Sequence, residues 1–187
     1  MAIPLATRLN AGFMPPRPVA SEPLPAATHT APKKRVTKFA GASAVGMPDE
    51  ALIDTGAILA LLDRSDRWHQ PCVSAFAQLR LPLLTSEAVL TELFHLVGDA
   101  RVPMEAAWKF VRSGALVLGP IEHAELPHLH ALMSRYWDRP MDFADATLVY
   151  LAKRESLSAI LTVDHADFAT YRIEGKREFR VLPGNRH

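Results

Sequence analysis

The chain has 187 residues, of which 49% are hydrophobic and 22% are charged, and its formal net charge is +1. This length and apolar content allow one full-sized domain with an appendage. The single cysteine, Cys72, excludes an intrachain disulfide and a thiolate-rich zinc site, and it suits a reducing, cytoplasmic setting. The sequence has no run of about 18 apolar residues, so no membrane-spanning helix is expected.

The first 48 residues differ in composition from the rest of the chain. They hold 8 of the 15 prolines and a formal charge of +5, which leaves −4 for the remaining residues. They show no sustained apolar period, so we predict a disordered, basic tail over residues 1–48 and a folded domain over residues 49–187. Three explanations of the tail stay open: the true start is Met47, the tail contacts nucleic acid or a partner, or it is a targeting peptide.

From residue 50 onwards, short apolar runs alternate with helical patterns. Such alternation with short connections predicts an α/β fold with a central, mainly parallel sheet that helices flank on both faces. In chain order, we predict strands at 51–54, 81–84, 115–118, 159–163 and 178–182, and helices at 55–62, 66–80, 87–97, 104–112, 122–136 and 142–155.

Two acidic residues follow predicted strands. Asp54 ends the apolar run 51–53, and Asp164 follows the run 159–163, with Thr162 two residues before it. Both acids therefore lie at the carboxyl end of a buried parallel strand, where open α/β folds build their sites. The alternative for Asp54 is that it only caps the helix that follows.

A third candidate, Glu92, lies on the predicted helix 87–97. It shares one edge of a helical stripe with Val89 and Leu93, so it faces partly inward. Glu87 lies in the first turn of the same helix, where a carboxylate suits the helix dipole without any further role. We therefore favour Glu92 as the site residue.

The fourth candidate, Asp145, continues into an apolar and buried helical stripe without a basic neighbour. Asp142 lies three residues earlier on the same face, and we interpret it as a favourable helix start. Asp167 is assigned to a solvated turn after Asp164.

Gathering these four carboxylates is costly without a cation. Two carboxylates about 4 Å apart repel by roughly 4 kcal/mol at an effective dielectric of 20. Oxygen ligands select a hard ion, Mg²⁺ first and Mn²⁺ as the alternative, over zinc. The acids thus predict metal-dependent chemistry on a phosphodiester.

Two rival enzymes share part of the first motif. Ile53-Asp54-Thr55-Gly56-Ala57 matches the local signature of retroviral-type aspartic proteases, but those proteins are β-rich and a helical pattern follows here. A haloacid-dehalogenase-type phosphatase requires a second Asp two residues after the first, where this chain has Gly56.

Taken in order, four segments resemble the PIN-domain nucleases, in particular the VapC-type toxins of bacterial toxin–antitoxin pairs. The matching stretches are IDTGAILALLDRSDRWH, TSEAVLTELFHLV, MDFADATLVYLAKR and AILTVDHADF, within residues 50–182. The resemblance implies a three-layer fold and a metal-dependent endoribonuclease. It implies four catalytic acids, Asp54, Glu92, Asp145 and Asp164, of which Asp54 and Asp145 hold the metal.

The resemblance also implies partners: an RNA substrate and a cognate antitoxin protein, and it allows a homodimer. Two alternatives keep the fold, namely an RNA-processing nuclease outside a toxin–antitoxin system and a catalytically silent binding module. Candidates for phosphate contacts around the site are Arg64, Arg67, Arg139, Lys153 and Arg154.

Overall fold

The computed structural model describes residues 50–139 and 141–184. The predicted tail over residues 1–48 lies outside these ranges, so its prediction is untested. No helix in the described part of the chain combines the length and apolar character that crossing a membrane requires.

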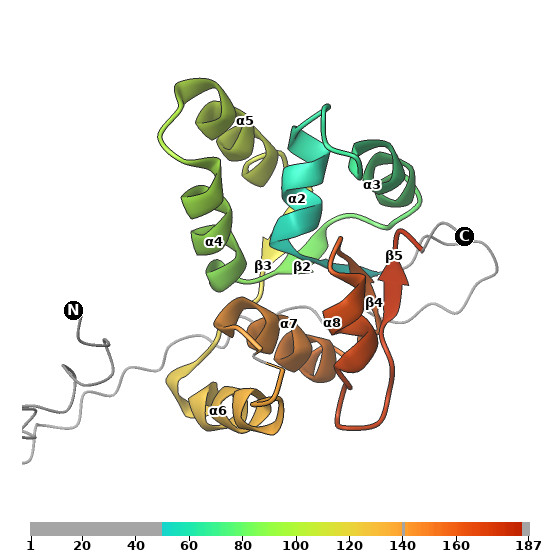
Figure 1. The fold of residues 1–187 in the computed structure, drawn as a ribbon. Coiled ribbons are helices and arrows are strands. Elements are labelled where there is room, and N and C mark those ends of the chain that lie inside the picture. The colour runs from blue at the N-terminus through green and yellow to red at the C-terminus, as the bar shows by residue number, and fades with distance from the viewer. Residues whose placement is uncertain (1–49, 140, 185–187) are drawn as a thin grey trace, which may run out of the picture. The chain divides into compact units, whose positions relative to one another are not determined.

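A parallel sheet of five strands, in the order β3-β2-β1-β4-β5, forms the centre of the described residues (Figure 1). Every residue of the three inner strands β2, β1 and β4 is buried, because helices cover both faces of the sheet. This confirms the predicted fold class, although each strand is shorter than predicted. The strands are β1 (Ala51–Ile53), β2 (Leu83–Thr85), β3 (Leu116–Leu118), β4 (Ala159–Leu161) and β5 (Arg180–Leu182).

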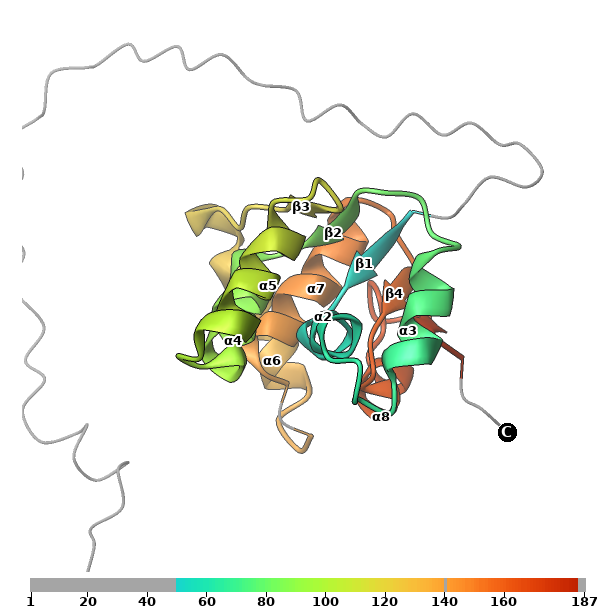
Figure 2. The ribbon, with the colours of Figure 1, turned by 90° about the horizontal axis from the view of Figure 1, so that it is seen from above.

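The helices form two layers. One face of the sheet carries α2 to α5, which lie next to one another in Figure 2, and the other face carries α6 to α8 (Figure 1). Leu52, Ile160 and Leu148 are among the fully buried side chains of the core between them. The helices are α2 (Thr55–Leu62), α3 (His69–Phe76), α4 (Glu87–Val97), α5 (Arg101–Val111), α6 (Leu126–Arg135), α7 (Phe143–Arg154) and α8 (His165–Thr170).

The topology creates a crevice between β1 and β4. The chain leaves β1 towards one helical layer and leaves β4 towards the other, which is the arrangement that opens a site at the carboxyl ends of parallel strands. The Asp54 amide donates to the Leu161 carbonyl at 3.0 Å, and this bond joins the ends of the two strands. Residues 54 and 162 are thereby held side by side.

Two helix predictions need correction, a third helix begins at Arg101 and not at 104, and a fourth was not predicted. The helix predicted at 66–80 spans only His69–Phe76, because Asp66 accepts a hydrogen bond from the Trp68 amide and holds its start in a turn. The helix predicted at 122–136 is divided into a 3₁₀ turn, His123–Glu125, and α6. Helix α8 was not predicted at all.

Candidate active site

A cavity of about 270 Å³ lies at the carboxyl ends of β1 and β4. Six carboxylates from four separate segments line it, and all four predicted acids are among them. They are Asp54, Glu92, Asp142, Asp145, Asp164 and Asp167. We call this space the acid cavity.

Asp54 lies at the inner wall of the acid cavity and is only 8% exposed. Its Oδ1 accepts from the Thr55 amide at 2.6 Å and its Oδ2 accepts from the Thr162 hydroxyl at 2.8 Å. Asp54 therefore caps α2 and also faces the cavity. Burial raises the pKa of Asp54 to about 6, the nearby Glu92 and Asp142 add to the rise, and the two hydrogen bonds oppose it.

Thr162 connects Asp54 to Asp164. Its hydroxyl donates to Asp54 and accepts from the Asp164 amide at 3.0 Å, so one side chain orients two acid-bearing segments. Asp164 in turn accepts from the Asp167 amide at 3.1 Å and caps α8.

Asp167 lies in α8 and lines the acid cavity, so its assignment to a solvated turn was wrong. Burial and the neighbouring Asp164 raise the pKa of Asp167, while Arg139 lowers it. A signal was present in the sequence: acids three residues apart, with the first at a strand end, are typical of a capped helix start.

Glu92 reaches the acid cavity from α4. Its Oε2 accepts from the Thr55 hydroxyl at 2.8 Å, which joins α4 to the start of α2. Glu87 is exposed and does not line this cavity, in agreement with the choice of Glu92. At Gly56, a Cβ would lie 2.6 Å from Val163 Cγ2, so only glycine allows α2 to start this close to β4.

Asp145 lies in the first turn of α7, and its pKa is raised further than that of Asp54. Burial raises its pKa to about 8, and Asp142 and Asp54 add to the rise. The Tyr171 hydroxyl donates to Asp145 Oδ2 at 3.1 Å. Asp142 accepts from the Asp145 amide at 2.7 Å, so it caps α7 as predicted and, in addition, lines the acid cavity.

The sequence did not predict two contacts of the site: the hydrogen bond from Tyr171 to Asp145 and the one from Thr55 to Glu92. Tyr171 is fully buried and reaches Asp145 from the segment after α8. The motifs carry no local signal for this contact, because the two residues are distant in sequence.

The donor set of the acid cavity suits a hard divalent cation, because it consists of carboxylate oxygens, and burial and neighbouring acids raise the pKa values of Asp54 and Asp145. In the described ranges, no three His, Cys, Asp or Glu side chains are gathered closely enough to hold an ion by themselves.

The predicted phosphate contacts have different surroundings. Arg154 is paired with Glu125 at 3.3 Å and with Glu155 at 2.8 Å, so its prediction as a phosphate contact is not favoured. Arg139 donates to the Ala166 carbonyl and the Thr170 hydroxyl, beside the acid cavity.

The chain is similar to known proteins in sequence and in fold. The PIN domain model matches residues 51–173. The chain is 33% identical to Ribonuclease VapC26 of Mycobacterium tuberculosis over 138 residues, which cover 71% of this chain and 99% of that protein. The crystal structure of Mycobacterium tuberculosis VapC20, a sarcin-ricin loop cleaving toxin, is similar in fold, with a TM-score of 0.57 and 19% identity over 63% of this chain and 92% of that one.

Proposed function

Because the chain belongs to the PIN-domain family, we propose that it is a metal-dependent endoribonuclease that acts as the toxin of a toxin–antitoxin pair. The observation that carries this proposal is the acid cavity, in which the four acids of the family motifs meet. The similarity to a ribonuclease over almost the full length of that relative supports RNA as the substrate.

In this proposal Asp54 and Asp145 hold a Mg²⁺ ion, with Mn²⁺ as the alternative. When bound, the ion lowers the pKa of a coordinated water and stabilises negative charge on the phosphate. Thr162 and Tyr171 fix the two ligand carboxylates through their hydroxyl groups. Glu92 and Asp164 stand across the same cavity, where a carboxylate can orient the attacking water and accept its proton.

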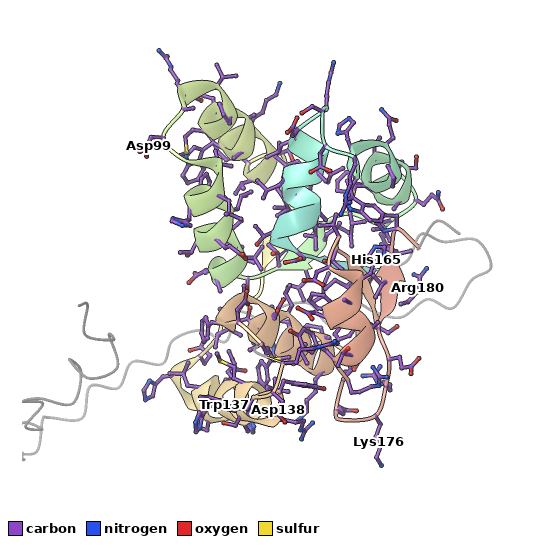
Figure 3. The ribbon with its side chains drawn as sticks, in the orientation of Figure 1. Asp99, Trp137, Asp138, His165, Lys176 and Arg180 are labelled. Carbon is purple, nitrogen blue, oxygen red and sulfur yellow. The ribbon has the colours of Figure 1, made fainter. Side chains whose placement is uncertain are left out.

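The test is RNA cleavage by the purified chain with Mg²⁺, with EDTA, and after the substitution Asp54→Asn. We expect cleavage with Mg²⁺ only and its loss in Asp54→Asn, because an amide cannot neutralise the cation. The matched control is Asp99→Asn, since Figure 3 shows Asp99 at the outer end of α4 and it does not line the acid cavity. Cleavage by Asp54→Asn at the rate of the control would refute the assignment.

An antitoxin partner is the second part of the proposal. An apolar groove of about 600 Å³ between α4 and α7 adjoins the acid cavity and shares Glu92 and Asp142 with it. Phe143 lines this groove and is 47% exposed. A protein bound there would cover the acid cavity as well as an exposed aromatic side chain.

Co-expression with the product of a reading frame directly upstream tests the partner. We expect a stable complex without RNA cleavage, and a weaker complex for Phe143→Asp than for Val102→Asp, whose side chain is 81% exposed on α5. Equal complexes from both variants would argue against the groove. The homodimer and the cytoplasmic location stay predictions.

A further inference from the structure

A second cavity, of about 250 Å³, lies between α6, α7 and the turn at residues 174–175. Three of its lining residues are basic or can become so: His128 and Arg135 from α6 and Lys153 from α7. We call it the basic cavity. Its remaining wall is partly apolar and includes the aromatic ring of Tyr150.

The two strong cations of the basic cavity are Arg135 and Lys153. Among the described residues, neither Arg135 nor Lys153 has a hydrogen bond or an ion pair through its side chain. Glu174 lines the same cavity without forming an ion pair with either. Arg154, the next residue after Lys153, has two carboxylate partners. The positive charge of the cavity is therefore left for a ligand.

Two details hold this site in shape. Gly175 has a φ of +74°, and a Cβ there would lie 3.1 Å from Arg135 Nη1, so a bare backbone leaves room for the guanidinium. Tyr150 donates its hydroxyl to Glu125 at 2.9 Å and stacks on His128 with 5.8 Å between the ring centroids. The aromatic wall is thus fixed by contacts on both sides.

Residues 135–139 connect the basic cavity to the acid cavity. Arg135 lines the first, and Arg139 donates to Ala166 and Thr170 of α8, the helix that brings Asp167 to the second. Between them, Trp137 is 81% exposed and lies on the outside of the molecule in Figure 3. An indole this exposed contributes nothing to the core and is suited to contact a ligand.

The distance between the two cavities fits a short stretch of nucleic acid. Asp145 and Lys153 are eight residues apart on α7, a rise of about 12 Å. Stacked nucleotides advance by about 3.4 Å each, so roughly three or four of them span this distance.

We propose that the basic cavity and Trp137 bind the single-stranded RNA next to the cleaved bond. Trp137 stacks on an unpaired base, and Arg135 and Lys153 each bind a backbone phosphate. The choice of RNA as the occupant rests on the proposed nuclease function. The residues after position 48 have a formal charge of −4, and the acid cavity repels a polyanion. The basic cavity attracts one, so it offers the RNA a place to bind.

Binding of a short fluorescein-labelled single-stranded RNA tests the proposal without any need for cleavage. The full chain carries Asp54→Asn in all samples, so that the RNA stays intact. We expect Trp137→Ala to weaken binding by roughly tenfold, in keeping with the loss of one stacked base, and Trp137→Phe to retain most of the affinity. We expect Arg135→Ala/Lys153→Ala to lower the slope of log affinity against log salt by about 1.4, which is two phosphate contacts on a single strand.

The control pair Lys109→Ala/Arg112→Ala removes the same charge from the end of α5 and is expected to keep the wild-type slope. Equal salt slopes and RNA affinities in the two double variants would overturn the proposal. A polyglutamate peptide that displaces the labelled RNA as strongly as unlabelled RNA does would also overturn it. Lys153→Gln alone, at an exposed position, gives a second measurement if the double variant unfolds. A wild-type chain that binds RNA in this way but never cleaves it would refute the nuclease function and leave RNA binding by the basic cavity and Trp137 standing.

Discussion

The segment 135–139 connects the acid cavity and the basic cavity. In both cavities, charged side chains lie close together with few partners of opposite charge among the described residues. In the acid cavity, Thr162, Thr55 and Tyr171 donate hydroxyl hydrogen bonds to acids without cancelling their charge. A cation, Arg139, acts on Asp167 and lowers its pKa. In the basic cavity, Arg135 and Lys153 have no carboxylate partner among the described residues. Structural ion pairs lie elsewhere, as at Arg154. These surroundings are what the two proposals require, a cation in the acid cavity and a phosphate in the basic cavity.

Of the substitutions that test this comparison of the two cavities, the one at Asp145 is expected to have the largest effect on RNA cleavage. We expect Asp145→Asn to lower kcat for RNA cleavage by about three orders of magnitude, since it removes a metal ligand and its charge. Arg135→Ala/Lys153→Ala, by contrast, is expected to raise KM and leave kcat nearly unchanged. Steady-state kinetics on one RNA checks both, and a shared loss of kcat would break the division between the two cavities.

The stability of the metal-free protein provides the second test. The folded-state pKa values of Asp54 and Asp145, about 6 and about 8, exceed the ordinary value of 3.8. Their contribution to stability is therefore complete below about pH 4 and is lost as the pH rises through 6 and 8. For Asp54 alone the loss is on the order of 3 kcal/mol.

Chemical denaturation from pH 4 to pH 8 measures this loss. We expect the free energy of unfolding to fall over this window in EDTA and to recover at pH 8 with Mg²⁺, which binds only the folded state. Asp145→Asn should flatten the upper part of the profile. A stability that is independent of both pH and Mg²⁺ would contradict the placement of charge in the acid cavity.

A smaller effect is expected at Thr162, which orients two acids at once. Thr162→Val keeps the shape but removes the donor to Asp54 and the acceptor for the Asp164 amide. We expect a loss of roughly 10- to 100-fold in Mg²⁺-dependent cleavage, as is typical when a partner of a metal ligand is removed. Thr162→Ser should restore most of the rate, and a serine variant as slow as the valine variant would show that packing matters more than the hydroxyl.

The smallest effect is expected at Tyr171. Tyr171→Phe deprives Asp145 of one neutral donor and leaves the carboxylate in place, so we expect less than a tenfold loss of cleavage. Tyr136→Phe is the matched control, because its hydroxyl accepts from the Arg172 amide and its ring packs on Tyr171 at 5.0 Å. Titration of cleavage against Mg²⁺ concentration separates the two, since only Tyr171→Phe should shift the midpoint.

The approximate positions of the five strands and the choice of the four motif acids were predictable, because both depend on local pattern. A buried strand followed by an acid predicts the site at Asp54 and Asp164, and an inward helical stripe predicts Glu92 and Asp145. The catalytic and metal-binding roles of these acids stay predictions. Helix α8 was missed because it is only six residues long and buries a single large side chain, Phe168.

Other features depend on contacts that no local pattern encodes. Asp142 was interpreted as a helix start because that role is visible in the sequence, whereas its place in the acid cavity follows from how α7 lies against α4. The contact from Tyr171 to Asp145 and the cavity between α6 and α7 likewise arise only when distant segments pack together.

The hydrogen bond between Thr162 and Asp54 also determines when, during synthesis of the chain, the acid cavity can form. Its two residues are 108 positions apart, so a chain still being synthesised has β1 and Asp54 long before the segment that completes the acid cavity. Until β4 emerges and pairs with β1, the acid cavity is incomplete. Under the proposed function, we therefore expect a growing chain on the ribosome, surrounded by RNA, to be inactive until nearly all of the domain has been made.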